Sequence, residues 1–137
     1  MSDDTIRMAG ILLITVPTIA LGGAALLTMI GRRDPGYLDN EVRQNLFRAG
    51  HAHAGVLVLL ALVGQLYVDE ASLSEGWEAV ARYGLVAAPI LMPLGFFLSV
   101  ASPNAMQPNR LILLTGLGGV SLSVAALTLG IGLVSAL

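Results

Sequence analysis

The sequence has no cysteine, no lysine and few charged residues of any kind. Without cysteine the chain has no disulfide, no thiolate metal site and no cysteine nucleophile. Charged residues make up 12% of the 137 positions, against about 25% in soluble domains. The net charge of -2 excludes a basic surface for nucleic acid. Apolar residues instead make up 55% of the chain, which predicts a membrane protein.

Four apolar segments alternate with short polar connections. They predict helices over residues of about 5–30, 40–68, 76–100 and 110–136, and each contains the roughly 20 apolar residues that cross a bilayer core. The acidic start, Met1 to Asp4, differs from the basic start of a cleaved signal peptide, so we expect the first segment to remain in the mature protein. The expected fold is a single all-α domain, 1–137, built as an up-down bundle of four transmembrane helices in the lipid bilayer.

The arginines predict the orientation of this bundle. Five of the seven lie in or next to the connections before the second and fourth segments, namely Arg32, Arg33, Arg43, Arg48 and Arg110. Only Arg7 and Arg82 belong to the opposite face. Cytoplasmic loops carry the excess of positive charge, so we expect a multi-pass protein of the cell membrane with both termini outside.

Small residues and prolines mark the predicted packing surfaces. Gly22 and Gly23 allow another helix to come close to the first segment, and Pro89 and Pro93 predict a kink in the third. The fourth segment carries a stripe of small residues at helical spacing: Gly116, Gly119, Ser123, Ala126 and Gly130. We expect this stripe to pack either inside the bundle or between the protomers of a homo-oligomer.

Both histidines of the chain lie in one short stretch, Phe47 to Gly55, at the polar edge of the second segment. Residues two apart on a helix point about 200° apart, so His51 and His53 cannot bind one small metal ion together. Each must face a different neighbour. Three functions fit such a pair.

The first is binding of haem, most plausibly haem b, or of another metal cofactor. Neutral imidazole is a common iron ligand, so His51 and His53 are the candidate cofactor and metal ligands. Gly50 and Gly55 leave room for a flat macrocycle. Arg48 and Arg110, on the same membrane face, are candidate partners for the propionates.

The second is a channel or transporter for protons or a small solute, because ionisable residues within membrane segments often line a path. The third is a structural role, in which the histidines hydrogen-bond the backbone near the interface. A chain of this third kind would be an accessory subunit that packs within a larger membrane complex. No serine–histidine–acid set, membrane carboxylate or phosphate-binding loop is visible, so we do not expect an enzyme.

Three stretches carry a resemblance to a known family. These are the stretch from Arg48 to Leu57, the stretch from Leu91 to Val100, and the stretch from Pro108 to Ile112. They resemble a family of small bacterial integral membrane proteins with a Gly-His-Ala-His-Ala-Gly motif. The resemblance implies the four-helix fold and brings no activity with it.

A second resemblance is confined to Gly50–Gly55. This stretch is similar to the glycine-histidine-x-histidine segment in the catalytic subunit of cbb-type haem-copper oxidases, where each histidine ligates a different haem iron. The resemblance implies that His51 matches the high-spin ligand and His53 the low-spin ligand. This chain has no further histidine for copper or for a second axial ligand. The resemblance therefore implies at most a haem-binding protein, or a homo-oligomer in which histidines of two protomers share the cofactor.

Overall fold

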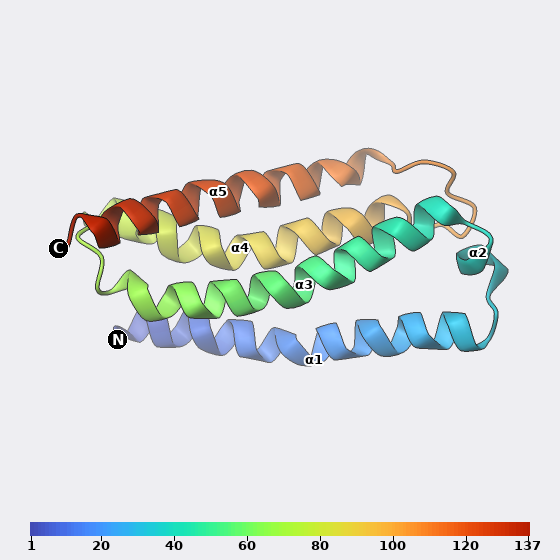
Figure 1. Ribbon diagram of the computed structural model, residues 1–137, viewed down its shortest axis with the longest axis horizontal. Coiled ribbons are helices and arrows are strands. Elements are labelled where there is room, and N and C mark those ends of the chain that lie inside the picture. Colours follow the sequence, from blue (N-terminus) through green and yellow to red (C-terminus); the bar gives the residue numbers. More distant parts are fainter.

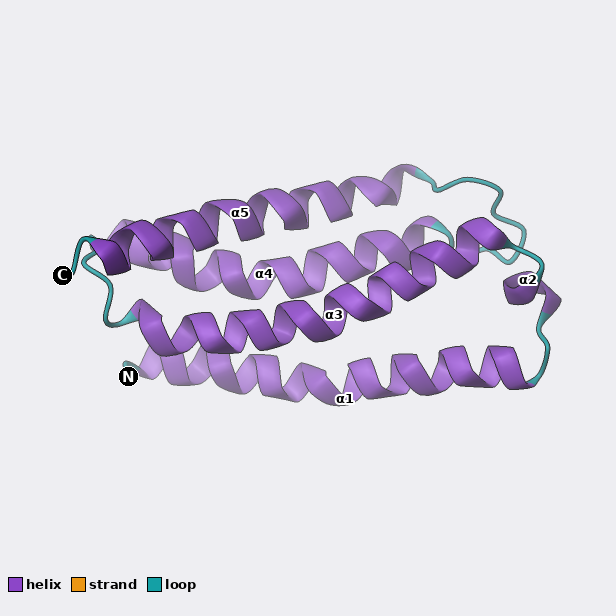
Figure 2. Ribbon diagram, in the orientation of Figure 1, coloured by secondary structure: helices purple, strands orange, loops and turns teal.

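A computed structural model describes all 137 residues, and it is helical throughout, without strands. The long helices lie side by side and are joined by short loops (Figures 1 and 2). Their bounds are α1 Asp3–Gly31, α3 Glu41–Val68, α4 Glu75–Ser99 and α5 Leu113–Val134, with a short α2 at Pro35–Leu38 and a 3₁₀ turn η1 at Arg110–Ile112. All four long helices, counting η1 with α5, are long and apolar enough to cross a membrane. The predicted all-α four-helix bundle is confirmed, and the chain is a multi-pass membrane protein by length and composition.

The helix ends follow the local sequence. Asn40 caps α3 through its side chain, which accepts a hydrogen bond from the Arg43 backbone N–H at 3.0 Å. Pro35–Leu38 form the one-turn helix α2, because Asp34 caps it and proline suits a first helical position. The last helix begins as the 3₁₀ turn, where the sequence predicted a regular helix from about residue 110.

The helices form an up-down bundle in which α4 packs against both α3 and α5, while α1 packs mainly against α3. The α4–α5 contact is close because glycines face it. A methyl group at Gly95 would clash with the Thr115 backbone nitrogen, and one at Gly118 would lie 2.8 Å from the Met92 backbone nitrogen. Both termini lie at the same end of the bundle (Figure 1). Which side of the membrane that end faces remains a prediction.

The small-residue stripe of the last helix does not pack inside the bundle. The buried positions of α5 are Gly118, Ala125, Leu129 and Gly132. The predicted stripe lies on the other side of the helix, where only Gly119 is partly covered and the remaining members are exposed. Of the two expected locations, contact between protomers is the one that remains a prediction.

α1 is attached firmly at one end only. Its buried residues are Thr5, Met8 and Leu12, all in its first third. From Pro17 to Gly31 no side chain of α1 is buried. The second half of α1 therefore lies against α3 with little packing to hold it.

A polar cluster holds the start of α1 against α3 and α4. Asp69, just after α3, accepts hydrogen bonds from the Ser2 backbone N–H at 2.5 Å and from the Thr5 hydroxyl at 2.8 Å. The buried Arg82 guanidinium of α4 pairs with Asp69 at 3.0 Å and also with Glu78 and Thr5. Burial alone would raise the pKa of the Asp69 carboxyl, but the hydrogen bonds from Ser2, Thr5 and Arg82 outweigh it and hold that pKa well below its usual range.

Arg43 has a matching role at the other end. Its guanidinium is buried and donates to the carbonyl oxygens of Val100 at 3.2 Å and Gly36 at 2.9 Å. It also lies 4.7 Å from the centre of the Phe47 ring. The loop before η1 is therefore fastened to α2 and α3 by one charged side chain that has no carboxylate partner.

Candidate ligand-binding site

The two histidines of α3 point away from each other. His51 lies against α1, next to Gly22 and Gly23. His53 lies on another side of α3, with its ring centre 5.1 Å from that of Phe96 on α4. The helical spacing of two residues produces this separation. One side chain therefore lies between helices and the other on the exterior.

His51 has its nitrogen-bearing edge against the backbone of α1. A methyl group at Gly23 would come within 3.1 Å of its Cε1 and 3.2 Å of its Nε2. One at Gly22 would lie 3.7 Å from its Nδ1. The glycine pair thus makes the space that the imidazole occupies. No protein group is hydrogen-bonded to either ring nitrogen of His51, although this side chain lies within the apolar part of the bundle.

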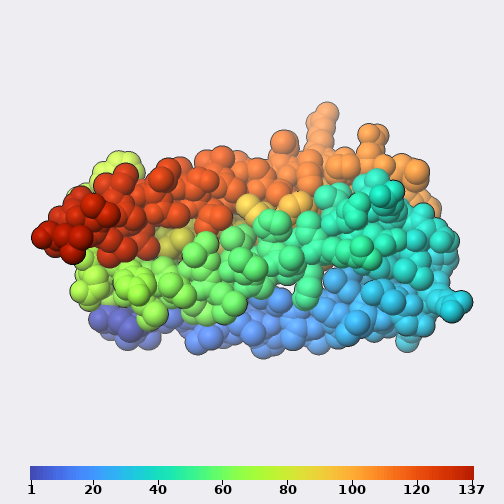
Figure 3. Space-filling view, in the orientation of Figure 1, coloured from blue at the N-terminus to red at the C-terminus, as the bar shows by residue number.

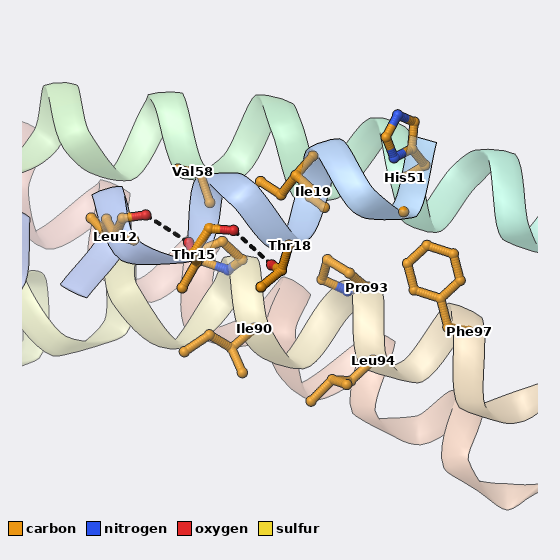
Figure 4. A pocket seen from close by; sticks show the side chains of 13 residues that line it. Leu12, Thr15, Thr18, Ile19, His51, Val58, Ile90, Pro93, Leu94 and Phe97 are labelled. Atoms are coloured by element: carbon orange, nitrogen blue, oxygen red, sulfur yellow. Dashed lines mark hydrogen bonds between the residues drawn. The ribbon is translucent and has the colours of Figure 1, made fainter. Parts of the chain in front are cut away.

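A first cavity of about 270 Å³ lies beside His51, between α1, α3 and α4 (Figure 4). Its polar groups besides the imidazole are the hydroxyls of Thr15 and Thr18, which donate to the Leu12 and Thr15 carbonyl oxygens at 2.6 Å each. Both hydroxyl oxygens keep lone pairs that can accept a hydrogen bond. The remaining wall is apolar and is formed by Leu12, Ile19, Gly22, Ala54, Val58, Pro89, Ile90, Pro93, Leu94 and Phe97.

A second cavity of about 610 Å³ lies on the other side of the same contact, between α1 and α3. Its wall is apolar except for His51 and consists of Val16, Ile19, Ala20, Gly23, Ala24, Leu27, Gly55, Val58 and Leu59. The two cavities share Ile19, His51 and Val58. The space-filling view shows the surface hollowed between α1 and α3 (Figure 3). His51 therefore lines two spaces: a mostly apolar pocket that also contains two threonine hydroxyls, and an apolar groove.

The first cavity ends inside the bundle. Leu12 and Val58, at one end of it, belong to the hydrophobic core together with Met8, Ala61 and Leu85. These side chains fill the space between the cavity and the Arg82 cluster. The polar groups around His51 thus form a pocket in this chain, and no second cavity continues it to the opposite membrane face.

His53 is exposed and makes a local hydrogen bond. Its Nδ1 lies 2.7 Å from the carbonyl oxygen of Ala49, one turn earlier on α3. A carbonyl can only accept, so Nδ1 carries the proton and Nε2 is left without one in the neutral ring. Histidines that ligate metals are oriented in this way, with one ring nitrogen donating and the other free.

The two predicted arginines do not join either histidine. Arg48 is exposed and donates to the Gln44 side chain at 3.2 Å. Arg110 is exposed at the start of η1 and has no side-chain hydrogen bond or ion pair. Their pairing with a propionate remains a prediction. No group of three or more histidine, aspartate or glutamate side chains is placed to hold a metal ion.

The two histidines differ in their fit to haem. A metal bound to an imidazole nitrogen lies about 2 Å from it, and on this side of His51 α1 comes so close that a methyl group at Gly23 would lie 3.2 Å from Nε2, which leaves no room for a macrocycle. His51 therefore fits haem only if α1 moves away. His53 is exposed, and its ring packs beside Phe96 on the outside of the bundle, so a ligand can reach it without moving α1.

The residues of α1 that line the first cavity were not predicted from the sequence. Leu12, Thr15, Ile19 and Gly22 follow one another at intervals of three or four, which places them on one face of the helix. That spacing would have identified the face. What it does not reveal is that this face meets His51, because the pairing of α1 with α3 depends on the whole bundle.

Comparison of the chain with protein-family models, with curated proteins and with solved structures gives no match. The surroundings of His51 combine a cavity, an apolar groove and a polar group without a partner.

Proposed function

We propose that this membrane protein binds a small ligand or cofactor at His51, between α1, α3 and α4. The observation that carries the proposal is the imidazole itself: it lines both cavities and has no hydrogen-bond partner within the chain. His51 is half-buried, so its unpaired ring nitrogens carry only part of the roughly 1–3 kcal/mol that leaving a fully buried polar group without a partner costs. A ligand with a hydrogen-bonding group removes this cost.

The cavities also have suitable dimensions and chemistry. Ligand pockets are mostly apolar, with a few polar groups that fix the orientation of the bound molecule. His51, Thr15 and Thr18 are three such groups around about 270 Å³ of space. Because this space ends against the core, we favour binding over passage of a solute through a single chain.

The test is to identify any small molecule that co-purifies with the protein. We expect a small molecule to be extracted from the purified wild-type protein, and its amount to fall at least about fivefold in His51→Ala. His53→Ala is the matched control, because it removes the same side chain from the exterior of α3. Equal amounts in wild type and His51→Ala, measured by mass spectrometry of the extracts, would contradict the proposal.

Haem held at His53 is a second candidate, favoured by the bond from Nδ1 to Ala49, which leaves Nε2 free. An exposed side chain on a membrane helix is covered either by lipid or by another copy of the chain. Only another copy can supply a second axial ligand, and that ligand would be its own His53. We expect a Soret band in protein from haem-supplemented cells that is lost in His53→Ala and kept in His51→Ala. A colourless, folded wild-type protein would rule this candidate out.

A further inference from the structure

The depth of His51 in the bundle restricts the charge of its ligand. Neither cavity has a charged side chain in its wall. On α1, the contact at Gly23 lies nine residues before Arg32, which is about 14 Å along the helix. On α3, Arg48 is three residues before His51, but it lines neither cavity and donates to the Gln44 side chain. A charged group at this depth would lose its hydration without gaining an ionic partner, at a cost of several kcal/mol. The part of the ligand that meets His51 is therefore uncharged.

The first cavity fits a ring with oxygen substituents. A cavity of about 150 Å³ holds benzene, so about 270 Å³ holds a substituted system of one or two rings. Phe97 and Pro93 provide flat apolar walls (Figure 4). A neutral imidazole offers one N–H donor, which suits a carbonyl oxygen.

The second cavity fits an apolar tail. It begins at His51, shared with the first cavity, and runs between α1 and α3. Ala20, Gly23 and Ala24 on α1 and Gly55 on α3 keep it wide. Its wall has no hydrogen-bonding side chain apart from His51, so a hydrocarbon chain is the occupant that matches it.

The weak packing of α1 gives such a molecule a way in. No side chain of α1 beyond Leu12 is buried, so moving this half of the helix away from α3 uncovers little core. A molecule dissolved in the bilayer reaches His51 from the side, between α1 and α3, without crossing a polar loop.

From the uncharged pocket, the ring-sized cavity and the apolar groove, we propose that the ligand at His51 is a lipid-soluble quinone: a neutral ring with carbonyl oxygens and a long hydrocarbon tail. The ring lies in the first cavity with a carbonyl oxygen accepting from His51, and the tail leaves along the second. This inference rests on the proposed binding function of the same site.

The experiment is equilibrium binding of decylubiquinone, a benzoquinone with a ten-carbon tail, to the protein in lipid nanodiscs. Empty nanodiscs give the background from partition into lipid. We expect saturable binding that His51→Ala weakens about tenfold, the equivalent of one hydrogen bond of about 1.4 kcal/mol. His51→Gln keeps an N–H donor and should retain most of the affinity, which guards against a variant that fails to fold.

Two further variants test the groove. Ala24→Phe fills the second cavity and should also weaken binding about tenfold. Ala25→Phe adds the same ring at the next position of α1, which is exposed and lines neither cavity, and should bind as wild type does.

The outcomes separate the two proposals. Quinone binding no higher than in empty nanodiscs, or unchanged in His51→Ala, overturns the quinone assignment. If a different molecule then accompanies the purified protein in a His51-dependent amount, binding at His51 stands with another ligand. If neither is found, both proposals fail.

Discussion

At the scale of single residues, polar side chains in this molecule are of two kinds, those with several hydrogen-bond partners and those that lack one. Asp69 and Arg82 belong to the first kind, since each makes several hydrogen bonds at the end of the bundle. His51 belongs to the second. The buried Gln65 Oε1 also has no partner, but only His51 lines cavities in which a ligand could supply one.

Replacement of Asp69 by asparagine should destabilise the protein by about 2 kcal/mol at pH 7. Glu78 still pairs with Arg82, so the cost falls below the 3–5 kcal/mol typical of a buried pair that is broken completely. Because folding lowers the pKa of Asp69, its contribution is complete above the unfolded pKa of about 3.9 and decreases as the pH falls below it.

Unfolding in mixed detergent micelles, followed by circular dichroism between pH 3 and pH 7, measures both effects. Wild type should lose stability below about pH 4, and Asp69→Asn should lose less. Asp4→Asn is a suitable control, because Asp4 pairs only with the exposed Arg7. Parallel pH curves for wild type and Asp69→Asn would show that Asp69 is not the group responsible.

At the scale of elements, the end of α1 has an unusual residue. Arg33 adopts φ of 51°, in the left-handed region where glycine is favoured. The backbone N–H of Arg33 donates to Ile30 and that of Asp34 to Met29, the pattern of a Schellman helix end. A side chain in this conformation costs roughly 1–2 kcal/mol.

Arg33→Gly should therefore stabilise the protein by about 0.5 kcal/mol, the relief of strain exceeding the greater entropy of glycine in the unfolded chain. Arg32→Gly is the matched control, since Arg32 has right-handed helical geometry and should lose stability instead. Unfolding in mixed detergent micelles, followed by circular dichroism, measures the stability of both variants. A loss of stability in both variants would mean that the conformation of Arg33 carries no strain.

The elements also show what the sequence could predict. The number, type and approximate bounds of the long helices follow from apolar length, and the cap at Asn40 follows from local chemistry. The face of α5 that packs on α4 could not be predicted from the sequence, because two sets of small residues alternate along that helix. Only the contacts with Gly95 and Met92 of α4 distinguish the two sets. Of the predicted site residues His51, His53, Arg48 and Arg110, only His51 lines the cavities, and the other walls could not be predicted because they come from three separate helices.

At the scale of the whole molecule, the bundle consists of a tight three-helix part, α3 to α5, and a loosely packed α1. The loop before η1 belongs to the tight part. Asn40 donates to the Pro103 and Ala105 carbonyls, and Arg43 to the Val100 and Ala101 carbonyls. The connection between α1 and α2 has no comparable side-chain clamp before Asp34.

The difference between the fastened loop before η1 and the free connection between α1 and α2 predicts where a protease cuts. Loops are usually nicked first, yet the clamped loop should resist, and trypsin should cleave first after the exposed Arg32 or Arg33. Mass spectrometry of a brief digest of proteoliposomes would identify the fragments. First cleavage after Arg110 would contradict the assignment of the tight part.

Such a cut divides the chain at a natural split point. One fragment is the first helix, and the other is a three-helix unit whose wall at His51 is then bare. The two could be produced separately and recombined in lipid, with Gly22 and Gly23 meeting His51 across the break. The candidate binding site would then exist only when both halves are present, so its occupancy would report their assembly.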